Sequence, residues 1–364
     1  MRVRVLSALA LAGVVGVAFL AARPSAAPAS AVGVTFQSIG PLAFGPDNVL
    51  FAADTQAASI VALDLGAGSG VAGAKAVPDL DQKLAALLGT DAASIAVTDM
   101  VVQPKTRNAY FSVMRGQGAD AKAALVRLDG SGALTVVALD TLRFTTVALP
   151  NAPVAAPTER RNPRTQSITD MVFHDGQLLV AGLSNEEFAS KLRAVKFPFA
   201  AVDPGTSVEI YHGNHGQLET RSPVYTLVPY TVGGTPHLIA GYLCTPLVKF
   251  PMASLQAGGK VRGTTIAELG NRNRPIDMFV YQQGGKDFLL MSNTSRGVMK
   301  IPANLFAAAA PITAPVEEKA GVPYETIESL KGVEQMDLFD QARALVLTRT
   351  APTGPLSVDL VALP

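Results

Sequence analysis

The chain has 364 residues, of which 48% are hydrophobic and only 16% are charged. Lys and Arg number 30 against 29 Asp and Glu, and this balance excludes a general attraction to nucleic acid or to acidic surfaces. The length allows two ordinary domains or one large all-β or α/β domain, and the 32 Gly and 25 Pro, spread between apolar runs, indicate many turns.

The N-terminal segment has the three parts of a secretory signal peptide. Arg2 and Arg4 precede an apolar run over 5–22, and the small residues at 29–31 form an A-x-A-like cleavage site. An uncleaved anchor helix is the alternative, because the run is almost long enough to span a bilayer. We expect a signal peptide over 1–31, a single domain over 32–364 with no membrane span after cleavage, and a periplasmic or secreted location. Cys244 is the only cysteine, so that domain has no intramolecular disulfide.

Three kinds of apolar run then follow one another six times along the chain. Apart from a helix expected over 79–88, no long helical period interrupts them. The first runs lie at 38–44, 96–102, 167–173, 222–228, 274–280 and 332–338. The second runs lie at 48–54, 108–114, 177–183, 237–243, 287–293 and 344–350. The third runs lie at 59–65, 124–130, 192–198, 246–252, 297–303 and 357–363.

Such a repeat of short strands is typical of a β-propeller. We therefore predict an all-β fold, a six-bladed β-propeller. The sixth unit ends after its third strand at Pro364, while a strand-like stretch over 32–38 precedes the first unit. We expect that N-terminal strand to complete the last blade as its outer strand and so to close the ring without a free edge.

The blade pattern resembles a known group of six-bladed propellers. The stretch over 40–54, GPLAFGPDNVLFAAD, is similar to the G-x-A-F-x-x-D-G-x-L-x-V-A-D blade opening of the SMP-30/gluconolactonase-like and NHL-repeat proteins. The resemblance concerns the architecture over most of the mature chain. Because the chain has no Trp, WD40 repeats and tryptophan-docked quinoprotein propellers match poorly.

Carboxylates recur at one position of the first runs, which line the central channel of a propeller. The equivalent residues are Pro41, Asp99, Asp170, Tyr225, Asp277 and Gln335. Like charges held close together are costly unless a cation or basic group neutralises them or a proton binds. The three Asp residues are thus candidates for capping backbone N–H groups, for contacting a ligand, or for holding a divalent cation, calcium in preference to zinc because the ligands are oxygens.

Arginine is concentrated in the loops on the face where the first strands begin. A guanidinium suits carboxylate or phosphate recognition, although carboxylates could also pair these arginines in a rim network. The candidate ligand-binding residues on this face are Arg161, Arg164, Arg221, Tyr225, Arg272, Arg274, Asn185 and Asn293.

The loop HGNHGQLETRSP, at 212–223, holds two of the four histidines. Gly213 and Gly216 argue against a helix, so the i, i+3 spacing does not by itself place both rings on one metal. A histidine oriented by a carboxylate could act as a general base. We take His212, His215 and Glu219 as candidate catalytic residues, with a Zn or Cu site and a purely structural polar loop as the alternatives.

Two classes of function remain open. We favour an exported propeller that binds a polar or anionic ligand, or a protein partner, on its Arg-rich channel face, with no nucleic-acid partner. The alternative is a calcium-type hydrolase or lactonase of the SMP-30-like class acting at the channel mouth. The resemblance implies a Glu, two Asn and an Asp around calcium, and here Pro41 stands where the Glu is expected. A quinone-cofactor dehydrogenase ranks third, and the sequence does not decide whether the protein is an enzyme.

Overall fold

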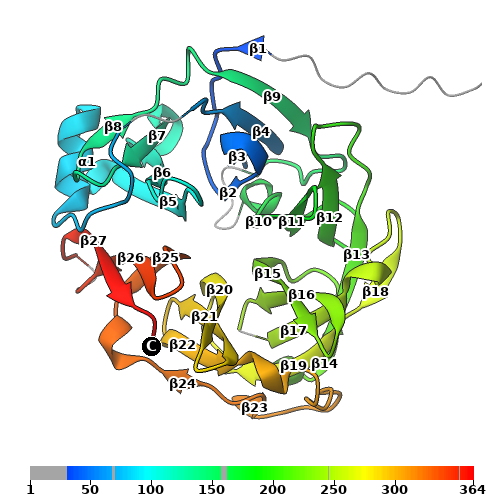
Figure 1. The fold of residues 1–364 in the computed structure, drawn as a ribbon. Coiled ribbons are helices and arrows are strands. Elements are labelled where there is room, and N and C mark those ends of the chain that lie inside the picture. Colours follow the sequence, from blue (N-terminus) through cyan, green and yellow to red (C-terminus); the bar gives the residue numbers. More distant parts are fainter. Residues whose placement is uncertain (1–30, 68–69, 157–161, 245, 352) are drawn as a thin grey trace, which may run out of the picture.

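The computed structural model describes residues 31–67, 70–156, 162–244, 246–351 and 353–364. These residues form six β-sheets arranged around a central axis, so the predicted six-bladed β-propeller is confirmed (Figure 1). The signal peptide expected over 1–31 lies outside the described residues except for Ala31. No helix in the described part of the chain is long and apolar enough to cross a membrane.

The apolar runs found in the sequence become the first three strands of each blade. Several of their hairpins turn through two residues with positive φ, as in Gly233-Gly234 and Gly284-Gly285, which matches the twist of paired strands. The innermost strands are β2 (Leu42–Phe44), β5 (Ile95–Val102), β10 (Asp170–His174), β15 (Val224–Val232), β20 (Pro275–Gln283) and β25 (Val333–Leu338). The second strands are β3 (Val49–Asp54), β6 (Ala109–Arg115), β11 (Gln177–Leu183), β16 (Thr235–Tyr242), β21 (Lys286–Asn293) and β26 (Arg343–Arg349). The third strands are β4 (Ser59–Asp64), β7 (Lys122–Leu128), β12 (Ser190–Lys196), β17 (Pro246–Pro251), β22 (Gly297–Pro302) and β27 (Leu356–Ala362).

Outer strands were not resolved by the sequence pattern, and several come from a distant part of the chain. For example, β9 follows blade 2 along the chain but pairs with β4 of blade 1, and β18 follows β17 of blade 4 but pairs with β13 of blade 3. The outer strands are β1 (Ala31–Val32), β8 (Leu134–Val136), β9 (Arg143–Ala148), β13 (Thr206–His212), β14 (Gln217–Glu219), β18 (Lys260–Arg262), β19 (Thr264–Leu269), β23 (Lys319–Gly321) and β24 (Glu325–Thr326).

The blades do not follow one another around the ring in chain order. We number each blade by the order of its innermost strand along the chain. Around the axis, the innermost strands stand in the order β5, β2, β10, β15, β20, β25, after which β25 meets β5 (Figure 1). Blade 1 therefore lies between blades 2 and 3, because the chain builds blade 2 on one side of blade 1, returns as β9, and continues to blade 3 on the other side.

The expected closure by an N-terminal strand in the last blade is wrong. Strand β1 pairs with β9 of blade 1, and Gly33 N–H and Val34 N–H continue this attachment by donating to Leu142 O and Leu139 O, both at 3.0 Å. Among the described residues, blade 6 consists of β25, β26 and β27, and its outer edge is met by Val77, whose N–H and C=O both bond Val358 at 2.9 Å. The segment leading into the helix thus occupies the edge that the N-terminal strand was expected to fill.

The predicted helix is present as α1 (Leu80–Leu88). It buries Leu80, Leu84 and Leu88 in a hydrophobic cluster that also contains Phe111 of blade 2 and Val358 of blade 6. The helix therefore covers the junction of blades 2 and 6, where the ring closes. Short 3-10 turns at η1 (Pro46–Asn48), η2 (Ala92–Ser94), η3 (Gly118–Asp120), η4 (Pro163–Gln166), η5 (Gly213–His215), η6 (Met252–Ser254), η7 (Ala303–Leu305) and η8 (Glu328–Leu330) lie in the loops.

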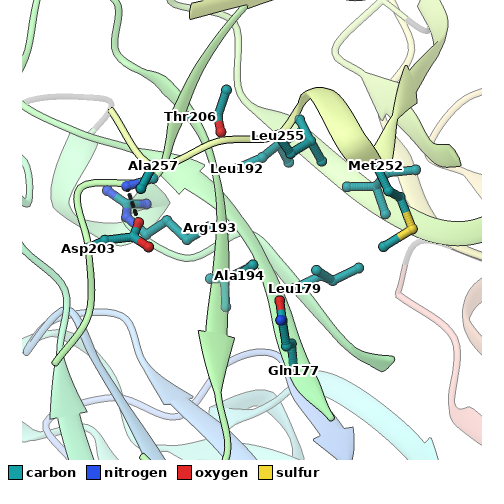
Figure 2. A pocket seen from close by; sticks show the side chains of 13 residues that line it. Gln177, Leu179, Leu192, Arg193, Ala194, Asp203, Thr206, Met252, Leu255 and Ala257 are labelled. Carbon is teal, nitrogen blue, oxygen red and sulfur yellow. Dashed lines mark hydrogen bonds between the residues drawn. The ribbon is translucent and has the colours of Figure 1, made fainter. Parts of the chain in front are cut away.

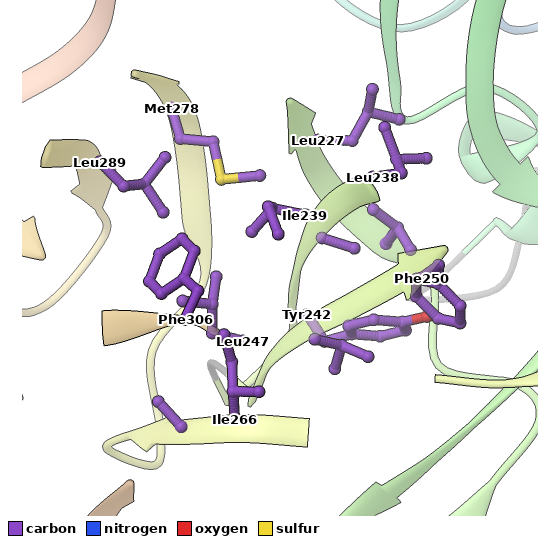
Figure 3. Close-up of a cluster of buried hydrophobic side chains, with 14 of the residues drawn as sticks. Leu227, Leu238, Ile239, Tyr242, Leu247, Phe250, Ile266, Met278, Leu289 and Phe306 are labelled. Carbon is purple, nitrogen blue, oxygen red and sulfur yellow. The ribbon is translucent and has the colours of Figure 1, made fainter. Parts of the chain in front are cut away.

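The largest hydrophobic cluster lies between neighbouring blades. Figure 3 shows both faces of blade 4: Leu238, Tyr242 and Phe250 lie on the face toward blade 3, and Ile239 lies on the face toward Met278 and Leu289 of blade 5. A cavity of about 100 Å³ lies on the blade 3 side, between β12 and the side chains of Leu238, Met252 and Leu255 (Figure 2). Burying a large apolar side chain contributes roughly 1.5–3 kcal/mol. Because the only cysteine is a free thiol, this interblade packing has no disulfide to support it.

Candidate functional site

Four aspartates line the central channel. Asp99, Asp170 and Asp277 lie on inner strands as predicted, and the structure adds Asp337 of β25. All four border a cavity of about 390 Å³, here called the axial cavity. Each side chain is half-buried, and the surface it retains faces this cavity rather than the outside of the ring.

Each carboxylate accepts a hydrogen bond from the backbone of a neighbouring blade. Asp99 Oδ2 accepts from Leu42 N–H of blade 1 at 2.6 Å, while its Oδ1 accepts from Met100 N–H at 2.8 Å. The other three bonds of this kind run from Leu227 N–H to Asp170 (2.7 Å), from Met336 N–H to Asp277 (2.8 Å) and from Val102 N–H to Asp337 (2.7 Å). Capping of backbone N–H groups, one of the three roles considered from sequence, is therefore present, and the capped group belongs to the adjacent blade.

The cluster of four aspartates, here called the axial carboxylates, binds protons more readily than free carboxyls do. Burial raises the pKa of Asp170 to about 7 and that of Asp337 to about 6. Burial, reinforced by the neighbouring carboxylates, raises the pKa of Asp99 and Asp277 well above the usual range. With its amide oriented by its hydrogen-bond partners, Gln335 donates to Asp99 Oδ1 at 3.2 Å and to Asp277 Oδ2 at 2.7 Å. The repulsion expected from sequence is thus relieved in part by protons and by an amide.

Calcium binding by Asp99, Asp170 and Asp277 stays a prediction. Within the described ranges, one group of three metal-ligating side chains has its ligand atoms within 4.8 Å of one another, and it is His212, His215 and Glu219. The three aspartates line the channel without forming a set of that kind. In each of them, Oδ2 already accepts a hydrogen bond from a backbone N–H.

Above the axial carboxylates, a cavity of about 590 Å³ opens between the loops of blades 5 and 6. We call it the mouth cavity. Its lining includes three basic side chains, Arg274, Lys331 and Arg349, and one acidic side chain, Glu334. Arg349 Nε is paired with Glu334 Oε1 at 2.8 Å, so two positive charges remain without an acidic partner in the lining. The mouth cavity is therefore positively charged.

Arg274 is held in place without an ion pair. Its guanidinium lies over the ring of Tyr225, 5.4 Å from the ring centroid, and the Tyr225 hydroxyl accepts from Gln166 Nε2 at 2.7 Å. Its backbone N–H bonds Thr294 Oγ1 at 3.1 Å, and no carboxylate among the described residues pairs with its side chain. A stacked but unpaired guanidinium keeps its donors available for a ligand.

The other predicted ligand-binding residues have different surroundings. Arg164 donates from Nε, Nη1 and Nη2 to the carbonyls of Gln56, Pro153 and Ala57 at 2.8–3.0 Å, so it fastens the loop before blade 3 to blade 1. Asn293 borders the mouth cavity, but its Oδ1 accepts from Asn273 and its Nδ2 donates to the carbonyls of Met291 and Gly297. Both side chains therefore have structural partners.

Four further predicted residues lie outside the mouth cavity. Arg221 and Tyr225 line a separate cavity of about 440 Å³, here called the side cavity. Arg272 and Asn185 are exposed and line neither cavity. Arg161 is outside the described residues. Sequence reasoning missed Lys331 and Asp337; the run VEQMDL carried a signal for Asp337, which follows the aligned Gln335 by two positions and so faces the same side of the strand.

The two histidines of the 212–223 loop lie at the junction of blades 3 and 4, away from the axial carboxylates. His212 ends β13, the turn η5 carries His215, and β14 returns Glu219 to pair with Ile210. The end of the 212–223 loop leads into β15, the first strand of blade 4, but the histidines themselves lie on the outer hairpin of blade 3.

This hairpin brings both imidazoles onto one carboxylate. His212 Nδ1 lies 3.0 Å from Glu219 Oε2, and His215 Nδ1 lies 2.5 Å from Glu219 Oε1. Burial alone would raise the pKa of Glu219, but hydrogen bonds from His212, His215 and Ser222 lower it to about 2. Glu219 is therefore a permanent anion under physiological conditions.

Comparisons with known proteins show the fold alone. No protein-family model and no curated protein matches the chain. Among solved structures, it is similar to a Thermus thermophilus protein described as an oxidoreductase (glucose dehydrogenase), at 13% identity and a TM-score of 0.37, covering 92% of this chain and 100% of that chain. It is also similar to the PQQ-bound aldose sugar dehydrogenase of Streptomyces coelicolor (12%, TM-score 0.32, 93% and 100%) and to Drosophila Semaphorin 1b extracellular domains 1–2 (10%, TM-score 0.37, 94% and 88%). The resemblance to SMP-30 and NHL propellers inferred from the blade pattern is supported at the level of the propeller and no further.

Proposed function

We propose that the protein is a binding propeller whose mouth cavity holds a small ligand bearing a carboxylate or phosphate group. The observation that carries this proposal is the pair of basic side chains, Arg274 and Lys331, that line a cavity of about 590 Å³ and pair with no carboxylate among the described residues. A cavity of this size is in the range that accommodates a small molecule.

The chemistry of the lining supports an anionic rather than a neutral ligand. A guanidinium presents several donors in a plane and matches the two oxygens of a carboxylate or phosphate. Thr294 and Ser295, which also line the cavity and are exposed, supply hydroxyl groups that can bind a polar ligand. Gln335 closes the cavity toward the axial carboxylates, which would otherwise repel an anion.

A calcium-dependent hydrolase would need the axial carboxylates as ligands, and each of them already accepts a hydrogen bond from a backbone N–H of a neighbouring blade. Export to the periplasm or the exterior belongs to the binding proposal and rests on the sequence of residues 1–31.

Binding to the mouth cavity is tested by calorimetric titration with inorganic phosphate and with citrate, using glucose as an uncharged probe. We expect the two anions to bind and Arg274→Ala to weaken binding about 10-fold to 100-fold, because a hydrogen bond to a charged group contributes about 1.5–3 kcal/mol. Affinity should also fall as salt concentration rises.

A matched control is Arg143→Ala, since Arg143 is 71% exposed on β9 and distant in the fold from blades 5 and 6. This variant should bind as the parent does. The proposal is contradicted if neither anion binds, or if Arg274→Ala and Lys331→Ala both leave the affinity unchanged.

A further inference from the structure

We propose that His212, His215 and Glu219 form a binding site for a divalent transition metal ion, with zinc as the probe. The site is independent of the ligand proposed for the mouth cavity, because it lies on the outer hairpin of blade 3. Three observations support it: the donor atoms, the buried histidine nitrogen, and the access.

The donor atoms are of the right kind and nearly in place. One ligand atom from each of His212, His215 and Glu219 lies within 4.8 Å of the other two, and the two imidazole rings are 3.8 Å apart between centroids. Zinc binds imidazole nitrogen and carboxylate oxygen at about 2.0–2.2 Å, which in a tetrahedral site separates neighbouring ligand atoms by about 3.3 Å. The present contacts of 3.0 Å and 2.5 Å to Glu219 would need to open by less than 1 Å.

The backbone fixes this arrangement. Gly216 has φ +63°, a left-handed conformation that turns the chain from η5 into β14. Gly213 has no room for a side chain, since a Cβ atom there would lie 2.7 Å from Val316 Cγ2. The two glycines that argued against a helix therefore build the tight turn that places the two rings against Glu219.

The second nitrogen of His212 has a carboxylate beside it. His212 is 1% exposed, and its Nε2 has no hydrogen-bond partner, while the nearest carboxylate oxygen, Glu268 Oε2, lies 3.9 Å away. A histidine that binds a metal through one nitrogen usually donates the N–H of the other to a carboxylate, which orients the ring. Metal at Nδ1 would place the proton on Nε2, facing Glu268.

Hydrogen bonds fix the carboxylate of Glu268 beside His212. Its Oε1 accepts from Gly213 N–H at 2.6 Å and its Oε2 from Asn214 Nδ2 at 2.8 Å, both within the turn that joins the two histidines. Glu268 is thus a positioning residue in this proposal. His215, by contrast, is 46% exposed, and Glu219 lines the side cavity, so an ion and a completing water have a path from solvent.

The test is titration of the chelator-treated full chain with zinc alone, followed by calorimetry, and with cobalt, followed by its visible absorption. We expect one metal per chain and a cobalt spectrum typical of four-coordinate nitrogen and oxygen ligands. His215→Ala and Glu219→Gln should each abolish zinc and cobalt binding. Glu268→Gln should weaken zinc binding about 10-fold to 100-fold. His237→Ala is the control, because the Nδ1 of His237 bonds Thr235 O on a hairpin of blade 4.

His215 is an exposed position whose replacement should leave the fold intact, which circular dichroism of the variant checks. The absence of zinc binding overturns the proposal. So does binding that survives His215→Ala and Glu219→Gln, or that is lost in Asp277→Asn instead, which would place the metal in the channel.

Discussion

Asp99→Ala is expected to lower the free energy of unfolding by about 4 kcal/mol at pH 5, because it leaves two buried N–H donors without acceptors at about 1–3 kcal/mol each. The donors are Leu42 N–H of blade 1 and Met100 N–H of blade 2, whose residues are 4% and 3% exposed. The substitution also removes one acceptor of the Gln335 amide. Urea unfolding followed by circular dichroism measures the change.

The control for this substitution is Asp91→Ala. Asp91 is exposed, and its side chain makes no capping hydrogen bond at η2, so its loss should change stability by less than about 0.5 kcal/mol. Two effects of the axial carboxylates, capping of N–H groups between blades and mutual repulsion, predict opposite changes in stability when Asp99 is removed. If mutual repulsion dominated, removing one carboxyl would stabilise the ring, and a more stable Asp99→Ala would therefore refute the interblade role.

The sequence was sufficient for the blades and insufficient for their order. Alternating apolar runs report which residues face a neighbouring layer, and this fixed the first three strands of every blade. These runs do not indicate which other strand each one pairs with. The run at 143–148 looks like any other strand, and only the structure shows that it returns to pair with β4 near residue 60. The same lack of partner information made the N-terminal strand look like the natural closure of blade 6.

For the candidate site too, the sequence shows which residues recur but not which groups they contact. The repeated Asp within the first runs was visible in the sequence, but the N–H groups that these side chains accept lie far away in the chain: Val102 and Asp337 are 235 positions apart. Arginines could be counted on one face from sequence. Whether a guanidinium is occupied by carbonyls, as in Arg164, or unpaired, as in Arg274, depends on loop geometry that no periodicity encodes.

The second large effect is a fall in stability as pH rises from 5 to 8. The pKa of Asp170 is raised to about 7 and that of Asp337 to about 6, while an unfolded aspartate has a pKa near 3.8. The folded protein therefore binds more protons than the unfolded chain over this range, and stability is lost as pH rises through the folded pKa values. For Asp170 alone the loss is about 3 kcal/mol between pH 5 and pH 8.

The direction of the pH dependence separates Asp170 and Asp337 from Glu219, whose pKa is strongly shifted the other way. Glu219 has its pKa lowered to about 2, so its contribution is complete above about pH 4.5 and is lost only as pH falls toward 2. Urea unfolding at intervals between pH 5 and 8, with a chelator present throughout, should thus show a decline that belongs to the channel. Asp170→Asn removes one titrating group while keeping the shape of the side chain, so it should flatten that decline even if it lowers stability at every pH. A free energy of unfolding of the parent that stays constant or rises across this range would contradict the prediction. It would mean that the axial carboxylates are ionised in the folded protein and that four backbone N–H groups, those of Leu42, Leu227, Met336 and Val102, are enough to stabilise the ionised form.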